Sequence, residues 1–434
     1  MGKLNKIFVI SLGCPKNLTD TEHVLACLKS SFNDLSFTNR PNDSDVILIN
    51  TCAFIEDAVS ESINSILELS HSRNKDQKVI VFGCLPLRYG SKLERLIPEV
   101  DKFIFHVEPN DVAKNILAFF GIKNQKRFPD YNRIFTGKPW QAYVKISDGC
   151  SNKCTYCLIP KIRGHLRCRK PEDIINEINI AVENGAVEII LVAQDLTSYQ
   201  VEDIDLASLI EKILEKTSVP WLRLMYLYPN GITDRILDLI SKESRICKYL
   251  DIPIQHASSR ILKRMGRGYS AKELNNIIEK VRKFLPEASL RTTVIVGFPG
   301  EEERDFNILK TFIERWRFHH LGCFVYCDEE EAYSRLLDEK VDKKVANKRK
   351  DSILSLQREI SLSINKDFIG KRLQVLVDGY CQESDLLLCS RTMFQAPDID
   401  GVTYINKGIS RPGALEEIRI TKAFEYDLLG ELIE

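Results

Sequence analysis

Gly149-Cys-Ser-Asn-Lys-Cys-Thr-Tyr-Cys157 is the segment on which the interpretation of this 434-residue chain depends. Its three cysteines have C-x3-C-x2-C spacing and follow an apolar, strand-like stretch at residues 142–146. Three thiolates this close together can hold three irons of a cubane cluster and leave the fourth iron without a protein ligand. In most electron-carrying clusters every iron has a protein ligand. The spacing therefore predicts a cluster whose fourth iron binds a substrate.

Cys150, Cys154 and Cys157 could also form a zinc site or a redox-sensing group of thiols. C-x2-C pairs are common in zinc sites, and grouped thiols can act as redox sensors. The chain has 13 cysteines, but its beginning, Met1-Gly-Lys-Leu-Asn-Lys, lacks the features of a secretory signal peptide. We therefore expect a cytoplasmic protein, in whose reducing surroundings clustered cysteines are ligands or catalysts. No apolar run approaches the roughly 18 residues of a membrane span, so we expect no membrane partner.

The first predicted domain, residues 4–121, alternates strand and helix signals and is typical of an α/β fold. Apolar stretches at residues 6–13, 45–51 and 78–83 each run into a cysteine, namely Cys14, Cys52 and Cys84. The carboxyl ends of parallel strands share one edge of a sheet, where ligands bind. These cysteines therefore predict a second iron–sulfur site, although small apolar cysteines can also simply fill buried strand ends. Residues 121–139 are polar, contain Pro129 and Pro139, and predict a linker.

The second predicted domain, residues 137–367, repeats a strand–helix rhythm. Strands are expected at residues 142–146, 187–193, 221–227, 249–254, 290–297 and 319–326, with helices at 171–184, 206–216, 271–284 and 301–316. Six units predict a partial (β/α)6 barrel. The polar residues that follow these strands should line its mouth, because chemistry gathers at the carboxyl ends of barrel strands. A charged helix is expected at residues 341–367.

Five residues at that mouth are candidate cofactor contacts: Gln194, Asp195, Tyr228, Gln255 and Gly297. Amide and carboxylate acceptors suit an amino group and a ribose, although Gln194 or Asp195 can equally cap the following helix. Gly297 can let the backbone approach a ligand, or serve a plain strand-to-helix turn. His256 is more often a structural histidine than a catalyst. No catalytic residue is assigned beyond the cluster ligands.

The third predicted domain, residues 368–434, has about five short β patterns and is expected to form a small antiparallel β-barrel. Lys and Arg total 61 over the whole chain, as do Asp and Glu. This domain, however, has seven Lys and Arg against eleven Asp and Glu, a net charge of −4. Affinity for RNA depends largely on cationic contacts to phosphate. We therefore expect no direct nucleic-acid binding and favour a basic protein as the partner.

With both cysteine triplets placed, the chain resembles the methylthiotransferases of the radical S-adenosylmethionine superfamily over nearly its whole length. The resemblance implies an N-terminal methylthiotransferase domain, a central radical domain and a C-terminal TRAM barrel. It also implies that Cys14, Cys52, Cys84 and Cys150, Cys154, Cys157 ligate two 4Fe-4S clusters. Two segments depart from the family pattern: residues 328–333, where relatives carry Glu-Gly-Thr, and residues 193–195, where the wider superfamily carries Gly-Gly-Glu.

Residues 11–20, 228–234, 249–258 and 396–401 are similar to the branch that acts on a ribosomal protein. This implies an enzyme that methylthiolates the β-carbon of an aspartate in a small-subunit ribosomal protein. The radical would come from S-adenosylmethionine on the second triplet and the sulfur from the first. A low-potential electron donor such as flavodoxin or ferredoxin is also implied. The alternatives are a tRNA methylthiotransferase of the MiaB type and a non-catalytic metal-binding or redox-sensing module.

Overall fold

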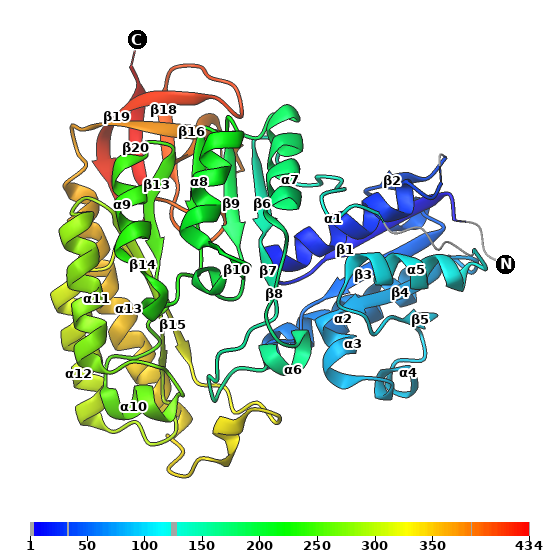
Figure 1. Cartoon of the computed structure of the whole chain (residues 1–434), viewed down its shortest axis with the longest axis horizontal. Helices are drawn as coiled ribbons and strands as arrows, with labels where there is room; N and C mark the ends of the chain where they lie inside the picture. Colours follow the sequence, from blue (N-terminus) through cyan, green and yellow to red (C-terminus); the bar gives the residue numbers. More distant parts are fainter. Residues whose placement is uncertain (1–3, 33, 123–127, 383, 434) are drawn as a thin grey trace.

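The computed structural model describes residues 4–32, 34–122, 128–382 and 384–433, which form three units (Figure 1). An N-terminal α/β unit lies to one side of a larger central sheet with its helices, and a β-barrel stands at one end of that sheet. Within the described ranges, no helix combines the length and apolar character needed to cross a membrane.

The N-terminal sheet is parallel, in the order β2-β1-β3-β4-β5. Its core strand β3 is buried along its whole length, as expected for a parallel sheet covered on both faces. The three strands predicted to precede cysteines are neighbours, which confirms that part of the expectation. The elements are β1 (Lys6–Ser11), α1 (Pro15–Lys29), β2 (Ser36–Thr38), β3 (Val46–Thr51), α2 (Glu56–Ser72), β4 (Lys78–Gly83), α3 (Cys84–Tyr89), α4 (Lys92–Leu96), β5 (Lys102–Phe103) and α5 (Pro109–Phe119).

The central sheet has six parallel strands in the order β15-β14-β13-β12-β9-β6, which confirms the partial barrel. A short antiparallel pair, β7 (Ser147–Asp148) with β8 (Arg167–Cys168), brackets the cysteine segment and α6 (Ile159–Arg163). The strands are β6 (Gln141–Lys145), β9 (Glu188–Val192), β12 (Trp221–Leu224), β13 (Ile246–Asp251), β14 (Ser289–Val296) and β15 (His320–Val325), with a small β10 (Gln200–Val201) and β11 (Ile204–Asp205) hairpin.

In the described part of the chain, seven helices that follow the cysteine segment belong to this unit. Two of them, α8 and α11, have the predicted bounds. Helix α8 begins where the Asp205 side chain accepts a hydrogen bond from Ser208 N, and α11 begins at a capping box of Ser270 and Glu273. The helices are α7 (Pro171–Glu183), α8 (Leu206–Lys216), α9 (Asp234–Lys242), α10 (Ser259–Arg264), α11 (Ala271–Phe284), α12 (Glu303–Trp316) and α13 (Lys343–Lys366).

The C-terminal strands close into a barrel in the order β16-β17-β18-β20-β19. Its pairs are antiparallel except β18 with β20, which is parallel, a detail absent from the sequence prediction. Cys381 and Cys389 form a disulfide between adjacent strands. The strands are β16 (Arg372–Cys381), β17 (Ser384–Thr392), β18 (Thr403–Lys407), β19 (Leu415–Ala423) and β20 (Leu428–Leu432).

The barrel packs against the inner face of the central sheet. Apolar side chains of that face, including Tyr143, Ile190 and Met225, share a core with Leu376 and Ala396 of the barrel. The loop after β17 reaches further, because Tyr249 Oη lies 2.7 Å from an Asp400 carboxylate oxygen. The third domain therefore covers part of the sheet interior.

The predicted linker is more than a spacer, although its residues 123–127 lie outside the described part. Arg133 is 8% exposed and donates to Glu22 of α1 at 2.7 Å and to Glu177 of α7 at 2.6 Å. One buried guanidinium thus joins the first helix of the N-terminal unit to the first long helix of the central unit.

Candidate functional site

The N-terminal cysteines follow three neighbouring strands, as predicted. Cys14 stands at the N-cap of α1, Cys52 directly follows β3, and Cys84 begins α3 after β4. Gly13 has φ +86°, and a Cβ there would lie 2.8 Å from the sulfur of Cys52. Any larger residue would push the Cys14 and Cys52 loops apart, so glycine is required for their close approach.

Asn17, which the sequence did not single out, ties the three strand ends together. Its side-chain nitrogen donates to the carbonyls of Leu12 at 2.9 Å and Thr51 at 3.0 Å. Its side-chain oxygen lies 3.8 Å from the sulfur of Cys84. The sequence could have pointed to this role, because Asn17 follows Cys14 by three residues and a buried amide can donate to carbonyls from two strands at once.

Both cysteine groups are poorly suited to serve as exposed reactive thiols. Burial raises the pKa of Cys52 to about 11 and that of Cys157 to about 12, and it also raises the pKa of Cys84 and Cys150. Redox-sensing cysteines are instead accessible and have a low pKa. Binding to a metal would keep such sulfurs deprotonated in these surroundings.

The second cysteine segment is a loop held between β7 and β8. Cys157 N donates to Cys154 O at 3.2 Å, and Cys150 N donates to Gly164 O at 3.1 Å. Gly149 has φ +71°, and a Cβ there would lie 2.2 Å from the carbonyl oxygen of His165. The loop is therefore folded back on itself, with its cysteines at the carboxyl end of β6.

A cation without an acidic partner faces this loop. Arg267 Nη1 lies 3.6 Å from the sulfur of Cys154, and the guanidinium stacks 4.2 Å above the centre of the Tyr228 ring. Its other hydrogen bonds go to Tyr156, Tyr269 and a carbonyl, and no carboxylate in the described part of the chain forms an ion pair with it. A buried guanidinium is costly without an anion, so this position suits a negatively charged group on Cys154.

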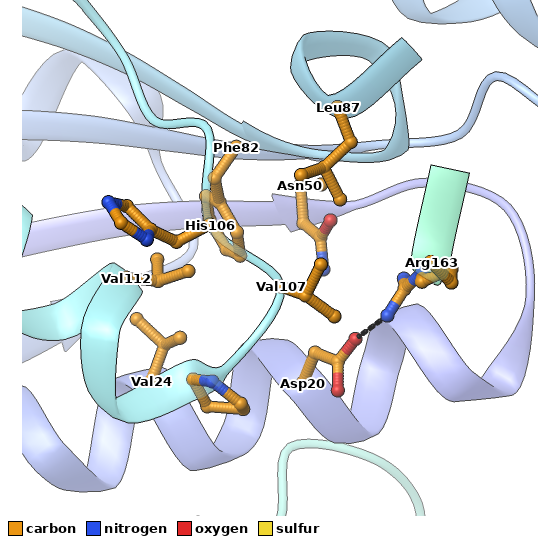
Figure 2. Close-up of a pocket in the computed structure, with 11 residues that line it drawn as sticks. Asp20, Val24, Asn50, Phe82, Leu87, His106, Val107, Val112 and Arg163 are labelled. Carbon is orange, nitrogen blue, oxygen red and sulfur yellow. Dashed lines mark hydrogen bonds and ion pairs between the residues drawn. The ribbon is translucent and has the colours of Figure 1, made fainter. Parts of the chain in front are cut away.

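A buried ionic network connects the two cysteine groups. Arg163, at the end of α6, donates to Asp148 at 3.0 Å and Asp20 at 2.6 Å, and its second nitrogen lies 3.6 Å from the sulfur of Cys84. Lys145 pairs with the same two carboxylates. Figure 2 shows Arg163 pointing from α6 towards Asp20 of α1, beside a cavity of about 10 Å³. The network thus joins residues just before and just after the second cysteine segment to Cys84.

Gln194 and Asp195 lie next to this segment, as expected for the end of β9. Gln194 Nε2 donates weakly to Asp148 at 3.4 Å, while its Oε1 is buried without a hydrogen-bond partner. Asp195 caps the short helix that follows and accepts from Asn152 at 2.9 Å. The capping explanation therefore fits Asp195, whereas Gln194 retains a free acceptor for a ligand.

The other three candidates occupy distinct surroundings. Tyr228 Oη accepts from Gly268 N at 3.1 Å. Gln255 has φ +66°, and its backbone carbonyl accepts from Ile295 N at 2.8 Å. Gly297 has φ +74°, and a Cβ there would lie 2.4 Å from the Cβ of Ala346. Packing of α13 therefore accounts for that glycine without a ligand. The cofactor roles of all five candidates remain predictions.

His256 is a structural histidine. Its Nδ1 accepts from Ser258 N at 2.9 Å, and burial lowers its pKa to about 3. It therefore stays neutral at physiological pH. The thiols Cys323 and Cys327 do not share a strand, because β15 ends at Val325.

The departure at residues 328–333 forms a bridge between the domains. Glu329 is 7% exposed, pairs with Arg88 of α3 at 2.6 Å, and accepts from Glu56 N of α2 at 3.0 Å. Ser334 N donates to the carbonyl of Thr155, inside the second cysteine segment, at 2.8 Å. This loop therefore touches both cysteine regions.

The described residues contain no set of three His, Cys, Asp or Glu side chains that converges on a single metal ion. A cubane cluster differs from such a site, because each thiolate binds its own iron. A cavity of about 340 Å³ lies beside Cys14 and is lined also by Tyr143, Tyr226 and Asp398, so all three units contribute to its wall.

Comparison with known proteins places three family models on the chain. They are the Radical SAM superfamily at residues 144–313, Uncharacterized protein family UPF0004 at 6–105, and the TRAM domain at 369–433. Among solved structures, the radical S-adenosylmethionine methyltransferase TsrM from Kitasatospora setae is similar, with TM-score 0.55 and 13% identity over 74% of this chain and 75% of that chain. The cobalamin-dependent radical enzyme OxsB matches at TM-score 0.54 and 12% identity, covering 82% of this chain and 56% of that chain. Both likenesses concern the fold.

Two curated relatives match almost end to end. The ribosomal protein uS12 methylthiotransferase RimO of Desulfotalea psychrophila is 40% identical over 99% of each chain. The protein of the same name from Aquifex aeolicus is 40% identical over 98% of this chain and 96% of its own length. The chain therefore belongs to the RimO family of radical S-adenosylmethionine methylthiotransferases.

Proposed function

We propose that this protein methylthiolates the β-carbon of an aspartate in the small-subunit ribosomal protein uS12. The observation that carries the proposal is the buried network through Arg163, which joins the two cysteine groups across the domain boundary. Attachment of sulfur to an unactivated carbon needs both a radical and a sulfur donor, and two coupled sites suit that requirement. The relatives named for this activity match the chain almost end to end.

Cys150, Cys154 and Cys157 would hold one 4Fe-4S cluster, and Cys14, Cys52 and Cys84 a second, auxiliary one. The donor chemistry fits, because thiolates are the usual ligands of such clusters. A buried arginine also faces each group, with Arg267 near Cys154 and Arg163 near Cys84. These cations would offset the negative charge that a thiolate-bound cluster brings into a buried site.

S-adenosylmethionine would bind at the carboxyl end of the central sheet, next to Cys150, Cys154 and Cys157. The unpartnered Oε1 of Gln194 is suited to accept from the cofactor's amino group. Asp195, Tyr228, Gln255 and Gly297 stay candidates for the remaining contacts. With the cluster, the cofactor supplies a carbon radical that can take hydrogen from an unactivated C–H bond, chemistry beyond any side chain.

The residues of the chain would position these groups and keep water out. Arg163 and Lys145 pair with Asp20 of α1 in buried ion pairs that would fix the second cysteine segment against the N-terminal unit. Glu329 and Arg88 add a second buried contact between the same domains. Two such contacts would keep the proposed sulfur-donating and radical-generating sites close to each other, which a transfer between them requires.

The partners of this reaction are further proposals. A basic ribosomal protein complements the acidic third domain, whereas a tRNA substrate would not. A low-potential donor such as flavodoxin or ferredoxin would supply electrons. Action on a ribosomal protein would place the enzyme in the cytoplasm, and the functional domains would span residues 4–121, 137–367 and 368–434.

Mass spectrometry of uS12 from cells with and without this gene tests the function. We expect one aspartate to carry the methylthio mass increment only when the gene is present. In vitro, anaerobic reconstitution should give about eight irons per chain, as two cubanes require, with 5'-deoxyadenosine formed on reduction. Unmodified uS12 together with methylthiolated tRNA would instead establish the MiaB-type activity. Zinc incorporation without 5'-deoxyadenosine would support the non-catalytic module.

A further inference from the structure

Lys16 stands where the auxiliary cysteine site meets the central sheet. It lies in the first turn of α1, two residues after Cys14. Its ammonium crosses to the other domain, where Nζ is 3.4 Å from the carbonyl oxygen of Ala193 and 4.2 Å from the centre of the Tyr226 ring. Ala193 immediately precedes Gln194, so the ammonium reaches the edge of the proposed cofactor site.

The ammonium of Lys16 lacks the carboxylate partners that Lys145 has. Lys145, the buried lysine of the nearby network, pairs with two carboxylates, Asp20 and Asp148. Lys16 has one long hydrogen bond and one aromatic face, and no carboxylate in the described ranges forms an ion pair with it. A carbonyl and a ring compensate a cation only in part. Cys14 and Asp148 lie near enough to act on the Lys16 charge without bonding to it, so the ammonium still has room for an anion from outside the chain.

A cavity of about 340 Å³ adjoins Lys16 through the neighbouring residues Cys14 and Pro15, although Lys16 itself does not form part of its wall. Tyr226, whose ring lies under Nζ, forms part of its wall together with Cys14, Met225 and Ile399. The wall is mostly apolar, and its volume lies within the range of pockets that enclose small ligands. Such a cavity can take an amino-acid side chain with its adjoining backbone. Asp398 also lines it, so an acidic ligand would turn its carboxylate away from Asp398 and towards the side where Tyr226 contacts Lys16.

We propose that Lys16 binds the carboxylate of the substrate aspartate and thereby sets the specificity of the enzyme for an acidic residue. This inference rests on the proposed function. The β-carbon of aspartate is bonded directly to its carboxylate carbon, so an ion pair to Lys16 fixes the position of the reacting C–H bond. An asparagine would present an uncharged amide to the same ammonium and would lose most of that attraction.

The test compares substrate binding by the holoenzyme with both clusters in place. Wild type, Lys16→Met and Lys16→Arg are titrated anaerobically with uS12 and with uS12 carrying asparagine at the modified aspartate. The matched control is Lys272→Met, which removes an exposed lysine from the first turn of α11. The affinity of each enzyme for S-adenosylmethionine is measured in parallel.

We expect Lys16→Met to weaken binding of the aspartate form roughly 10- to 100-fold, the usual worth of a hydrogen bond between charged groups. The asparagine form should bind wild type and Lys16→Met equally, and Lys16→Arg should retain preference for aspartate. The Lys272→Met control should match wild type throughout.

Two results would overturn the assignment. Equal weakening of the aspartate and asparagine forms would show that Lys16 does not recognise the carboxylate. Weaker affinity for S-adenosylmethionine, with uS12 binding unchanged, would assign Lys16 to the carboxylate of the cofactor instead. If the wild-type enzyme methylthiolates uS12 and either of these results appears, only the Lys16 proposal fails. If the wild-type enzyme leaves uS12 unmodified, both the proposed function and the role of Lys16 fail.

Discussion

The guanidinium of Arg163 lies 3.6 Å from the sulfur of Cys84, although the two residues belong to different domains. Arg163 ends the short helix that follows Cys157, and Cys84 follows the fourth strand of the N-terminal sheet. One side chain therefore contacts Cys84 while its other nitrogen holds Asp20 and Asp148, which lie beside the segment of Cys150, Cys154 and Cys157.

Arg163→Gln should strongly destabilise the apoprotein. The change leaves two buried carboxylates, Asp20 and Asp148, with Lys145 as their only remaining cation in the network. Removing one partner of a buried ionic group costs about 3–5 kcal/mol, measured as the free energy of unfolding in denaturant. Arg235→Gln is the control, because its ion pair with Glu211 is exposed and should contribute less than about 1 kcal/mol. Equal losses in the two variants would contradict this account.

Arg267→Met should make the reduction potential of the cluster on Cys150, Cys154 and Cys157 more negative. The potential depends on net charge and on hydrogen bonds to the cluster sulfurs, and Arg267 supplies both at 3.6 Å from Cys154. A redox titration followed by electron paramagnetic resonance measures the shift. Lys263→Met removes the same charge from an exposed position on α10 and should leave the potential unchanged. An unshifted potential in Arg267→Met would refute the electrostatic role.

Gly297→Ala should cost more stability than Gly90→Ala. Both glycines have positive φ, +74° and +63°, which strains an alanine by about 1–3 kcal/mol. A Cβ at Gly90 meets nothing within 4 Å, whereas one at Gly297 lies 2.4 Å from the Cβ of Ala346. Overpacking adds about 1–3 kcal/mol at Gly297 alone. Thermal unfolding of the two variants measures the difference, and equal melting temperatures would show that α13 moves away freely.

Cys14→Ala should separate the two proposed activities. The variant should reconstitute with about four irons, the content of one cubane, and still form 5'-deoxyadenosine on reduction. Methylthiolated product should disappear, because the auxiliary site would lack a ligand. Cys27→Ala is the control, since that buried cysteine lies on the same helix but packs in the apolar core. Loss of 5'-deoxyadenosine along with the product would count against the division of labour.

Acid should destabilise the fold in part through His256. Burial lowers its pKa to about 3 in the folded protein, against 6.5 for an ordinary histidine. The unfolded chain therefore binds the extra proton between these values, so stability is complete above pH 6.5 and falls as pH decreases. The contribution reaches about 1.4 kcal/mol per pH unit. His256→Asn should flatten the dependence of melting temperature on pH, whereas His71→Asn, at an exposed position, should not.

The sequence predicted the repeating elements well because local patterns determine them. Apolar runs of strand length gave both parallel sheets, and the helix expected at residues 271–284 agrees with α11 at both ends. The cysteine edge was also predictable, since a strand of known direction fixes where the next residue lies. Contacts between domains were harder to predict from the local sequence. The polar residues Arg163, Arg267 and Asn17 have partners in distant segments, and no periodic pattern predicts such contacts.

The surroundings of Gly297 and the closure of the C-terminal barrel also depend on contacts that the local sequence does not predict. Gly297 was expected either to admit a ligand or to serve a strand-to-helix turn, and the sequence did not show that Ala346 of α13 would lie against it. The parallel β18–β20 pair depends on how the barrel closes, which no single strand reveals. Long-range pairing decides such features, so they become visible only in the folded chain.

The ion pairs of Arg133 bear on how a substrate can approach. Swinging the N-terminal unit away from the central sheet would leave Glu22 and Glu177 without their shared cation. Glu177 would keep its ion pair with Arg169, but Arg133 could stay with only one of its two glutamates. Because breaking a buried ion pair is costly, hinge opening at this junction is disfavoured. A protein substrate would therefore have to thread a side chain into an already assembled enzyme, which favours a target aspartate on a protruding loop.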